Sequence, residues 1–343
     1  MGSPGLQRLL AEMAEQPQVV RRVLEQHRSA ARRLAPLLSG ASALVLVARG
    51  SSDHSAVYGR YLFETRNRLL TSLAAPSTVT LYGAGPRLGG TVVIAVSQSG
   101  QGEDVVAYVQ EARRQGAVTV ALVNDPASPL AHAAEQVLDL AAGPEVSVPA
   151  TKTVTAQLAA FALLSFELSG EDPLAPFEAA AQAITQVLSL REDTRAMAQS
   201  LAHSAAISVI GRGLAYPIAL ELALKFKETS DTRAEAFSAA DFQHGPIALL
   251  DRDHPALLLD LGGKTSAPAR QLAALAQGRG APTHLISVGP HASGDLSLAV
   301  EVHEALLPLV GLVLGQLLAV ELALAKGLDP SAPTGLTKVT STR

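Results

Sequence analysis

Two short stretches of the chain carry side chains that could hold an anion. The first is Ala48-Arg-Gly-Ser-Ser-Asp-His, where Gly50 permits a sharp turn and Ser51 and Ser52 carry hydroxyl groups. A helix that begins there would offer backbone N–H groups and a positive dipole end to an anion. Together with Asp53, the same serines are also good helix caps, so an ordinary capped turn is the alternative interpretation.

The second stretch is Ser97-Gln-Ser-Gly-Gln-Gly-Glu-Asp, which again follows a strand-like apolar run. The hydroxyl and amide groups of Ser97, Gln98 and Ser99 could wrap a phosphate together with backbone N–H groups. No Gly-Lys-Ser/Thr follows, which disfavours a nucleotide-binding P-loop. The corresponding stretch of the second half, Asp260-Leu-Gly-Gly-Lys-Thr, lacks the Ser-Gln-Ser unit. We therefore expect one half of the chain to bind phosphate.

A third group of residues could move protons. Glu221, Lys225 and Glu228 are spaced to share one face of a helix. A ladder of surface ion pairs would explain that spacing, but the rest of the helix is largely apolar, and charges on a buried helix are costly unless they are paired or functional. His244 lies in a Gly-Pro turn, where a histidine can act as a general acid or base near neutral pH.

These residues must be positioned by a repeated arrangement of elements. Leu44-Val-Leu-Val-Ala-Arg-Gly-Ser-Ser matches Ile207-Ser-Val-Ile-Gly-Arg-Gly-Leu-Ala. Three further pairs of strand-like runs recur at nearly the same offset, namely 92–97 with 256–261, 118–124 with 284–289, and 136–140 with 298–302. Self-similarity of this kind indicates an internal duplication.

Continuously apolar runs alternate with helical segments in each half, as at 104–115 and 268–277. This pattern predicts an α/β fold with two tandem doubly wound parallel-sheet domains, whose ligands lie beyond the carboxyl ends of the strands. The expected organisation is a helical segment over 1–41 with a break at Pro17, a first domain over 42–168, a helical connector over 169–198, and a second domain over 199–343.

Composition excludes several classes of function. The formal net charge is −4, so nucleic acid is not an expected partner. The chain has no cysteine and no metal-ligand spacing of histidines, so we expect no metal and no cofactor. No signal peptide is evident after Met1, and the apolar stretch 305–325 contains Pro308, Gln316 and Glu321. These features predict a buried core helix, no membrane partner and a cytoplasmic protein.

At these residues the chain resembles the sugar-isomerase (SIS) family, in particular the isomerase half of glucosamine-6-phosphate synthase and the SIS-type glucosamine-6-phosphate deaminases. The resemblance extends from about Arg22 onward. Besides the two loops, it is carried by Ala142-Gly-Pro-Glu-Val-Ser-Val-Pro-Ala-Thr-Lys, Gly211-Arg-Gly-Leu-Ala-Tyr-Pro-Ile-Ala-Leu-Glu, Leu224-Lys-Phe-Lys-Glu, Ala234-Glu-Ala-Phe and His244-Gly-Pro.

The resemblance implies roles for individual residues. Ser52, Ser97, Gln98 and Ser99 match phosphate-binding residues, alongside Gly50 and Ser51 of the first loop, and Val148 matches a residue that lines the sugar pocket. Glu228 matches the carboxylate that moves the proton between C1 and C2. His244 matches a histidine that assists ring opening from a neighbouring subunit, which implies a homodimer. Lys225 and Lys338 match lysines near the C1–C2 end of the sugar.

The resemblance also frames the choice of reaction. The synthase takes ammonia from glutamine with a cysteine nucleophile, which this chain lacks, so we expect a deaminase that converts glucosamine 6-phosphate to fructose 6-phosphate and ammonia. An aldose–ketose isomerase or deglycase of another phosphosugar is the alternative enzyme, and a sugar-phosphate-binding regulator is the non-catalytic one. Gln101 and Gly102 replace the Glu-Thr that commonly ends the phosphate loop of the family, which removes one hydroxyl.

Overall fold

The computed structural model describes residues 3–338. Their contacts divide the chain into two compact units. The unit that we call the first unit contains residues 18–146, 152–177 and 337–338, and the second unit contains residues 3–17, 147–151 and 178–336. Each unit is built around one five-stranded sheet, so each is described on its own.

The sheet of the first unit is entirely parallel. Its strands are β1 (Leu44–Val47), β2 (Thr71–Leu73), β3 (Val92–Ser97), β4 (Val118–Val123) and β5 (Gln136–Asp139). They are arranged in the order β2-β1-β3-β4-β5. The order reverses between the adjacent strands β1 and β3, and this is the point at which doubly wound sheets bind ligands.

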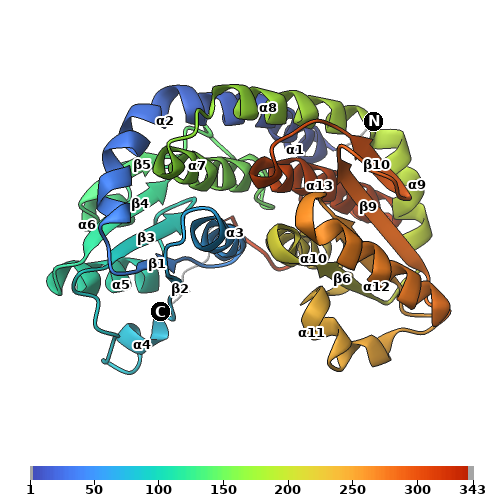
Figure 1. Cartoon of the computed structure of the whole chain (residues 1–343). Helices are drawn as coiled ribbons and strands as arrows, with labels where there is room; N and C mark the ends of the chain where they lie inside the picture. The colour runs from blue at the N-terminus through green and yellow to red at the C-terminus, as the bar shows by residue number, and fades with distance from the viewer. Residues whose placement is uncertain (1–2, 339–343) are drawn as a thin grey trace. The chain divides into compact units, whose positions relative to one another are not determined.

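Helices cover both faces of this sheet (Figure 1). They are α2 (Gln16–Ser39), α3 (Ser51–Thr65), α4 (Ser77–Thr80), α5 (Glu103–Arg114), α6 (Pro129–Ala133) and α7 (Lys152–Ser169). Alternate strand residues such as Val45, Val93 and Ala121 pack with α5 and α6 in one buried apolar cluster. Helices α3 and α7 pack against each other on the other side. Because both faces of the sheet are buried, its strands are almost continuously apolar.

The second unit repeats this topology. Its strands are β6 (Ala206–Gly211), β7 (Arg233–Ser238), β8 (Ala256–Asp260), β9 (Thr283–Gly289) and β10 (Leu296–Ala299), all parallel. The order β10-β9-β8-β6-β7 is the order of the first sheet read from its other edge. The predicted fold class, two tandem α/β domains related by duplication, is therefore confirmed.

The helices of the second unit include one that is buried along nearly its whole length. They are α1 (Pro4–Ala14), most of α8 (Leu174–Ser189), α9 (Arg191–Leu201), α10 (Tyr216–Ser230), α11 (Ala239–Gln243), α12 (Ser266–Gly278) and α13 (Leu307–Ala325). Helix α13 is the single candidate membrane span among the described residues by length and apolar composition, and that window is entirely buried inside the fold. Its charged residue Glu321 accepts from Arg191 at 2.5 Å and from Arg195 at 3.1 Å. The expectation of a buried core helix at 305–325 is confirmed.

Two strands and one helix boundary differ from the sequence prediction. Strands β2 and β7 were not predicted, because β2 has only three residues and β7 alternates polar and apolar residues. The break predicted at Pro17 is present but falls at Glu15, between α1 and α2, and Pro17 is the second residue of α2, where its missing N–H costs nothing.

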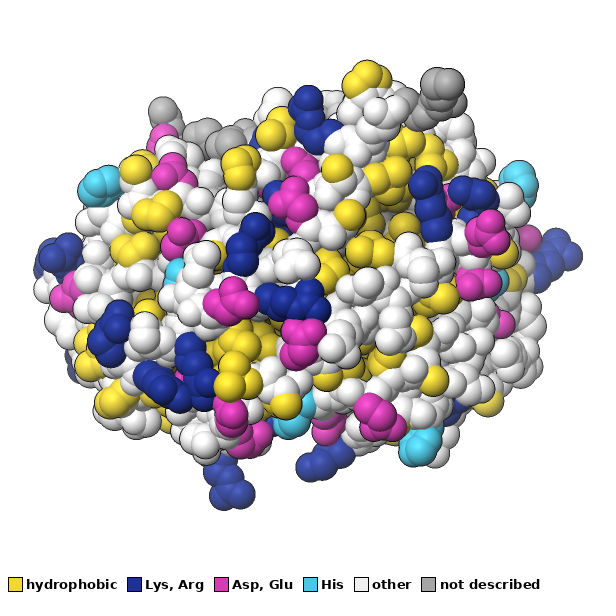
Figure 2. All heavy atoms as spheres, turned by 90° about the horizontal axis from the view of Figure 1, so that it is seen from above, with side chains coloured by type: hydrophobic (Ala, Val, Ile, Leu, Met, Phe, Trp, Pro, Cys, Tyr) yellow, Lys and Arg dark blue, Asp and Glu magenta, His cyan; other side chains and the backbone are white. Residues whose placement is uncertain are grey.

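The face shown in Figure 2 carries charges of both signs. On the face shown in Figure 2, basic and acidic side chains are interspersed, and neither sign forms a continuous field. This agrees with the small net charge of −4. An anionic ligand must therefore be attracted by local groups and not by the field of the whole molecule.

Candidate functional site

Both phosphate-loop candidates leave the carboxyl ends of adjacent strands in the first unit. The Ala48–Gly50 stretch connects β1 to α3, and the Ser97–Gly102 stretch connects β3 to α5. Strands β1 and β3 flank the point where the strand order reverses, so the two loops lie at the edge where doubly wound sheets bind ligands. Glycine is required at Gly100, which has a φ of +64° and whose added Cβ would lie 2.1 Å from Ser128 Oγ.

The serines of the second loop are tied to backbone amides. Ser97 Oγ accepts from the N–H of Gly100 at 3.0 Å, and Ser99 Oγ accepts from the N–H of Gln101 at 3.3 Å. A hydroxyl that accepts in this way still has its own hydrogen to donate. Both side chains are half-buried, as is Gln98. The loop can therefore present two fixed hydroxyl donors to an anion.

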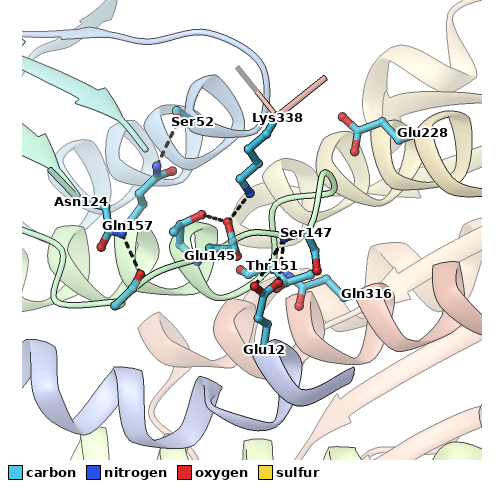
Figure 3. Close-up of polar contacts among 12 residues, drawn as sticks. Glu12, Ser52, Asn124, Glu145, Ser147, Thr151, Gln157, Glu228, Gln316 and Lys338 are labelled. Atoms are coloured by element: carbon cyan, nitrogen blue, oxygen red, sulfur yellow. Dashed lines mark hydrogen bonds and ion pairs between the residues drawn. The ribbon is translucent and has the colours of Figure 1, made fainter. Parts of the chain in front are cut away.

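Ser52 is held by a glutamine that the sequence analysis did not single out. Gln157 of α7 donates from Nε2 to Ser52 Oγ at 2.9 Å (Figure 3). Its Oε1 lies 2.8 Å from Ser55 Oγ. All three side chains are buried. The hydroxyl hydrogen of Ser52 is thus left for another acceptor. The available signal was the single amide side chain of α7, which lies among buried residues.

The start of α3 corrects the capping interpretation of the first loop. Ser51 is the first helical residue, so the N-cap position falls on Gly50, whose φ is +57°. No side-chain hydrogen bond caps α3 within residues 3–338. Gly102 occupies the same position before α5, also without a side-chain cap in the described chain. Neither Ser51 nor Ser52 nor Asp53 is the N-cap.

The tail lysine meets a buried carboxylate in the first unit. Lys338 Nζ lies 2.8 Å from Glu145 Oε2, which also accepts from Thr153 Oγ1 at 2.7 Å (Figure 3). The Glu145 side chain is fully buried, whereas Lys338 is about one-fifth exposed. Glu145 belongs to the Ala142–Lys152 motif, but the sequence analysis assigned it no role.

In the second unit, the predicted triad is not a surface ladder. Lys225 Nζ lies 2.5 Å from Glu228 Oε2 and 3.3 Å from Glu221 Oε1. The Lys225 and Glu221 side chains are 2% exposed, while Glu228 is 21% exposed. Burial alone would lower the pKa of Lys225, but the two carboxylates outweigh it and the net shift raises that pKa. Lys225 is therefore an ammonium, and Glu228 is the member of the triad that solvent can reach.

Two further predicted residues also belong to the second unit. His244 ends α11 and is exposed, in the turn before Gly245 and Pro246, as expected. Val148 is half-buried in the 147–151 segment.

Buried side chains from two helices hold that short segment. Glu12 of α1 accepts from the N–H of Ser147 at 3.2 Å, and Gln316 of α13 donates to the carbonyl of Thr151 at 3.2 Å (Figure 3).

Within the described residues, no group of three or more His, Asp or Glu side chains is arranged to hold a metal ion.

Two parallel sheets of one topology, each flanked by helices, define the class of protein. The SIS domain family matches residues 37–165 and 200–325. The chain belongs to this family, and the two matched segments correspond to its two halves.

Several named proteins are similar to this chain in sequence or in fold. Glutamine–fructose-6-phosphate aminotransferase [isomerizing] of Thermococcus kodakarensis is 33% identical over an alignment that covers 96% of this chain and 57% of that protein. The chain thus spans little more than half the length of this curated relative. The C-terminal domain of glucosamine-fructose-6-phosphate aminotransferase from Francisella tularensis has the same fold, with a TM-score of 0.85 and 24% identity over 95% of this chain and 98% of that one. Glucosamine-6-phosphate deaminase from Thermotoga maritima also shares the fold, with a TM-score of 0.79 and 19% identity over 98% and 100% of the two chains.

Proposed function

We propose that the protein is an isomerising glucosamine-6-phosphate deaminase, which converts glucosamine 6-phosphate to fructose 6-phosphate and ammonia. In this proposal Gly50, Ser51, Ser52 and the 97–99 loop bind the phosphate, and Val148 lines the sugar pocket. Glu228 is the base. We further propose a cytoplasmic homodimer in which His244 assists ring opening in the neighbouring subunit.

The chemistry needs a single base that reaches two carbons. In the open-chain sugar, Glu228 removes the proton from C2, and the C2–H electrons form a C1–C2 double bond as C1=O becomes an enol. The proton is then returned to C1, which leaves an imine at C2. Water adds to this imine and releases ammonia, so the product is the ketose. The carbonyl and the imine acidify the neighbouring C–H bonds, and general acid–base catalysis contributes ~10²–10⁴-fold to such steps.

The observation that carries this proposal is the position of Glu228 in its triad. Its carboxylate is reachable by solvent and accepts from the buried ammonium of Lys225. Glu221 also contacts the same lysine, so the ammonium stays paired while the Glu228 carboxylate remains accessible. The raised pKa of Lys225 keeps this amine protonated, so it is a poor nucleophile. If a Schiff base with the open-chain ketose forms, Lys338 is the lysine that we assign to it.

Product analysis tests the reaction. Purified protein is mixed with glucosamine 6-phosphate, and ammonia and fructose 6-phosphate are measured together. We expect equal amounts of the two products. Formation of fructose 6-phosphate from glucose 6-phosphate, without any ammonia from the amino sugar, would indicate an aldose–ketose isomerase. No product from either sugar at high protein concentration would exclude both.

Mixing two inactive variants tests the shared active site. Glu228→Gln and His244→Asn chains should each lose more than about 100-fold in turnover, since each lacks a proton-transfer group. If His244 acts in the neighbouring subunit, a mixed dimer of the two variants contains one intact site. Random reassociation should then restore about a quarter of wild-type activity. No recovery in verified mixed dimers would place both residues in the same subunit's site.

A further inference from the structure

The proposed phosphate crevice has few charged groups of its own. The loop from Ser97 to Gly102 carries no charged side chain, and neither do Gly50, Ser51 and Ser52. The first turns of both helices are acidic, with Asp53 in α3 and Glu103 and Asp104 in α5. A phosphate dianion would therefore meet neutral donors backed by three carboxyl groups.

One cation does border this crevice. Arg49 lies between β1 and Gly50. Its Nε donates to Asp104 Oδ2 at 2.7 Å, and one Nη lies 2.7 Å from the same oxygen. Asp104 is 2% exposed, whereas the arginine side chain is 50% exposed. The ion pair thus links the loop after β1 to the helix that follows the loop after β3.

The ion pair with Asp104 fixes the orientation of the Arg49 guanidinium and leaves some of its N–H donors available to a ligand. Arginine has five N–H donors in a rigid planar fork, and the two bonds to Asp104 use the Nε–H and one hydrogen of an Nη group. The remaining donors make no further hydrogen bond within residues 3–338. A fork that is held on one side and open on the other is well suited to a phosphate oxygen.

We propose that Arg49 is a phosphate ligand of this site and that the buried Asp104 is its positioning residue. The proposal rests on the proposed phosphate site. Arg49 would supply a permanent positive charge beside the phosphate and partly offset the carboxyl groups of these first turns. Its position also acts on Asp53: burial raises the pKa of Asp53, and His54 and Arg49 oppose that rise. Recognition of a phosphorylated sugar over the free sugar would therefore depend on Arg49.

The primary test is Arg49→Gln, with the glucosamine 6-phosphate assay and calorimetric titration of inorganic phosphate. We expect the KM and the phosphate Kd to rise about tenfold, which is the size of one lost charge-assisted hydrogen bond, with kcat little changed. Arg60→Gln is the matched control. Arg60 is 47% exposed on α3 and also pairs with a carboxylate, Glu64, so a general loss of surface charge would affect both variants equally.

A double variant separates binding from folding. Arg49→Gln alone leaves the charge of Asp104 buried without its partner and can destabilise the fold. Arg49→Gln with Asp104→Asn removes both charges, so the fold should recover while phosphate affinity stays about tenfold weak, because the cation is still missing. Asp104→Asn alone keeps the cation but loosens it, and should give an intermediate affinity.

Wild-type phosphate affinity in the double variant would overturn the proposal for Arg49 and leave the deaminase proposal standing. Equal losses in the Arg60 control would also overturn it. If the wild-type protein binds neither inorganic phosphate nor glucosamine 6-phosphate, both the phosphate site and the role of Arg49 are wrong.

Discussion

At the residue scale, the candidate catalytic groups are distinguished by burial more than by type. Lys225 and Glu221 are almost fully enclosed, while Glu228 reaches solvent from the same helix face. Burying a charge is expensive unless it is paired, so the lysine is held by two carboxylates. This arrangement keeps one carboxylate accessible at a defined position, which is what a proton-transferring base requires.

Replacement of Lys225 by methionine should destabilise the protein by about 3 kcal/mol, because it removes the ammonium that both carboxylates contact. The pKa of Lys225 is raised by folding, so its stabilising contribution is present below the unfolded pKa of about 10.4 and is lost as the pH rises through the folded value. Denaturant unfolding of both proteins at several pH values measures the difference. It should stay constant between about pH 7 and about pH 9.

Lys227→Met is the matched control for this prediction, since Lys227 lies on the same helix but is exposed. A surface lysine without a buried partner should change stability by less than about 0.5 kcal/mol. An equal loss in both variants would mean that the buried triad contributes nothing specific.

Residue types and spacing were sufficient to predict which side chains share the α10 face, but not their partners. The helical period brings Glu221, Lys225 and Glu228 together whatever surrounds them. In contrast, Gln157 reaches Ser52, and Glu145 reaches Lys338, across long stretches of chain. Such contacts depend on how helices and loops pack, which a local pattern does not encode.

At the scale of elements, the position of α3 depends on a close contact with α7. A Cβ added at Gly59 of α3 would lie 2.7 Å from the ring of Phe161 on α7. Phe161 is fully buried and packs edge-on against Phe63, with ring centroids 5.9 Å apart, so the ring has no room to move away. Because α3 carries Ser51 and Ser52, this contact also fixes the first loop.

Gly59→Ala should therefore destabilise the protein by about 1–3 kcal/mol through overpacking, although alanine favours helices in general. It should also weaken phosphate binding, since α3 must shift. Thermal unfolding and phosphate titration measure the two effects. In Gly278→Ala of α12, the added Cβ meets nothing within 4 Å, so this control should be neutral or slightly stabilising. A stable Gly59→Ala protein would show that the helices can separate without cost.

Most strands could be predicted from their apolar runs, including β5 at a sheet edge, whereas β2 and β7 could not. Strands β3 and β8 are buried over most of their length, which gives a continuous apolar signal. Strand β7 lies at an edge of its sheet, with Arg233 and Glu235 exposed, and its sequence reads as a polar linker. Backbone pairing with β6 holds β7 in the sheet, and this pairing cannot be predicted from the local sequence pattern.

At the scale of the whole molecule, duplication has kept one topology and altered the chemistry of one copy. In the second unit, the loop after β8 begins at Asp260, which is buried and lies 2.8 Å from Arg270 and 2.9 Å from Ser266 Oγ. A carboxylate thus occupies the strand end that corresponds to Ser97 in the first unit. An anion would be repelled there by the charge of Asp260.

The chain should accordingly bind one phosphosugar and not two. Isothermal titration with glucosamine 6-phosphate, or with fructose 6-phosphate if turnover interferes, should give a stoichiometry of about one per chain. Ser97→Ala combined with Ser99→Ala should abolish this binding, while Asp260→Asn should leave the stoichiometry unchanged. Two equivalent sites per chain would mean that the second crevice has kept its affinity for phosphate.

Gly50 is the N-cap of α3 and Gly102 is the N-cap of α5. Because a glycine has no side chain to cap a helix, a bound anion would stabilise both helix starts. With no side-chain cap in the described chain, both helix starts would be completed by the bound ligand itself. Amide hydrogen exchange in these first turns should slow when phosphate is added. It should stay unchanged at α6, where Ser128 already caps the helix by accepting from Ala131. Bound substrate would then stabilise the first turns of α3 and α5, and these turns would be less ordered in the ligand-free protein.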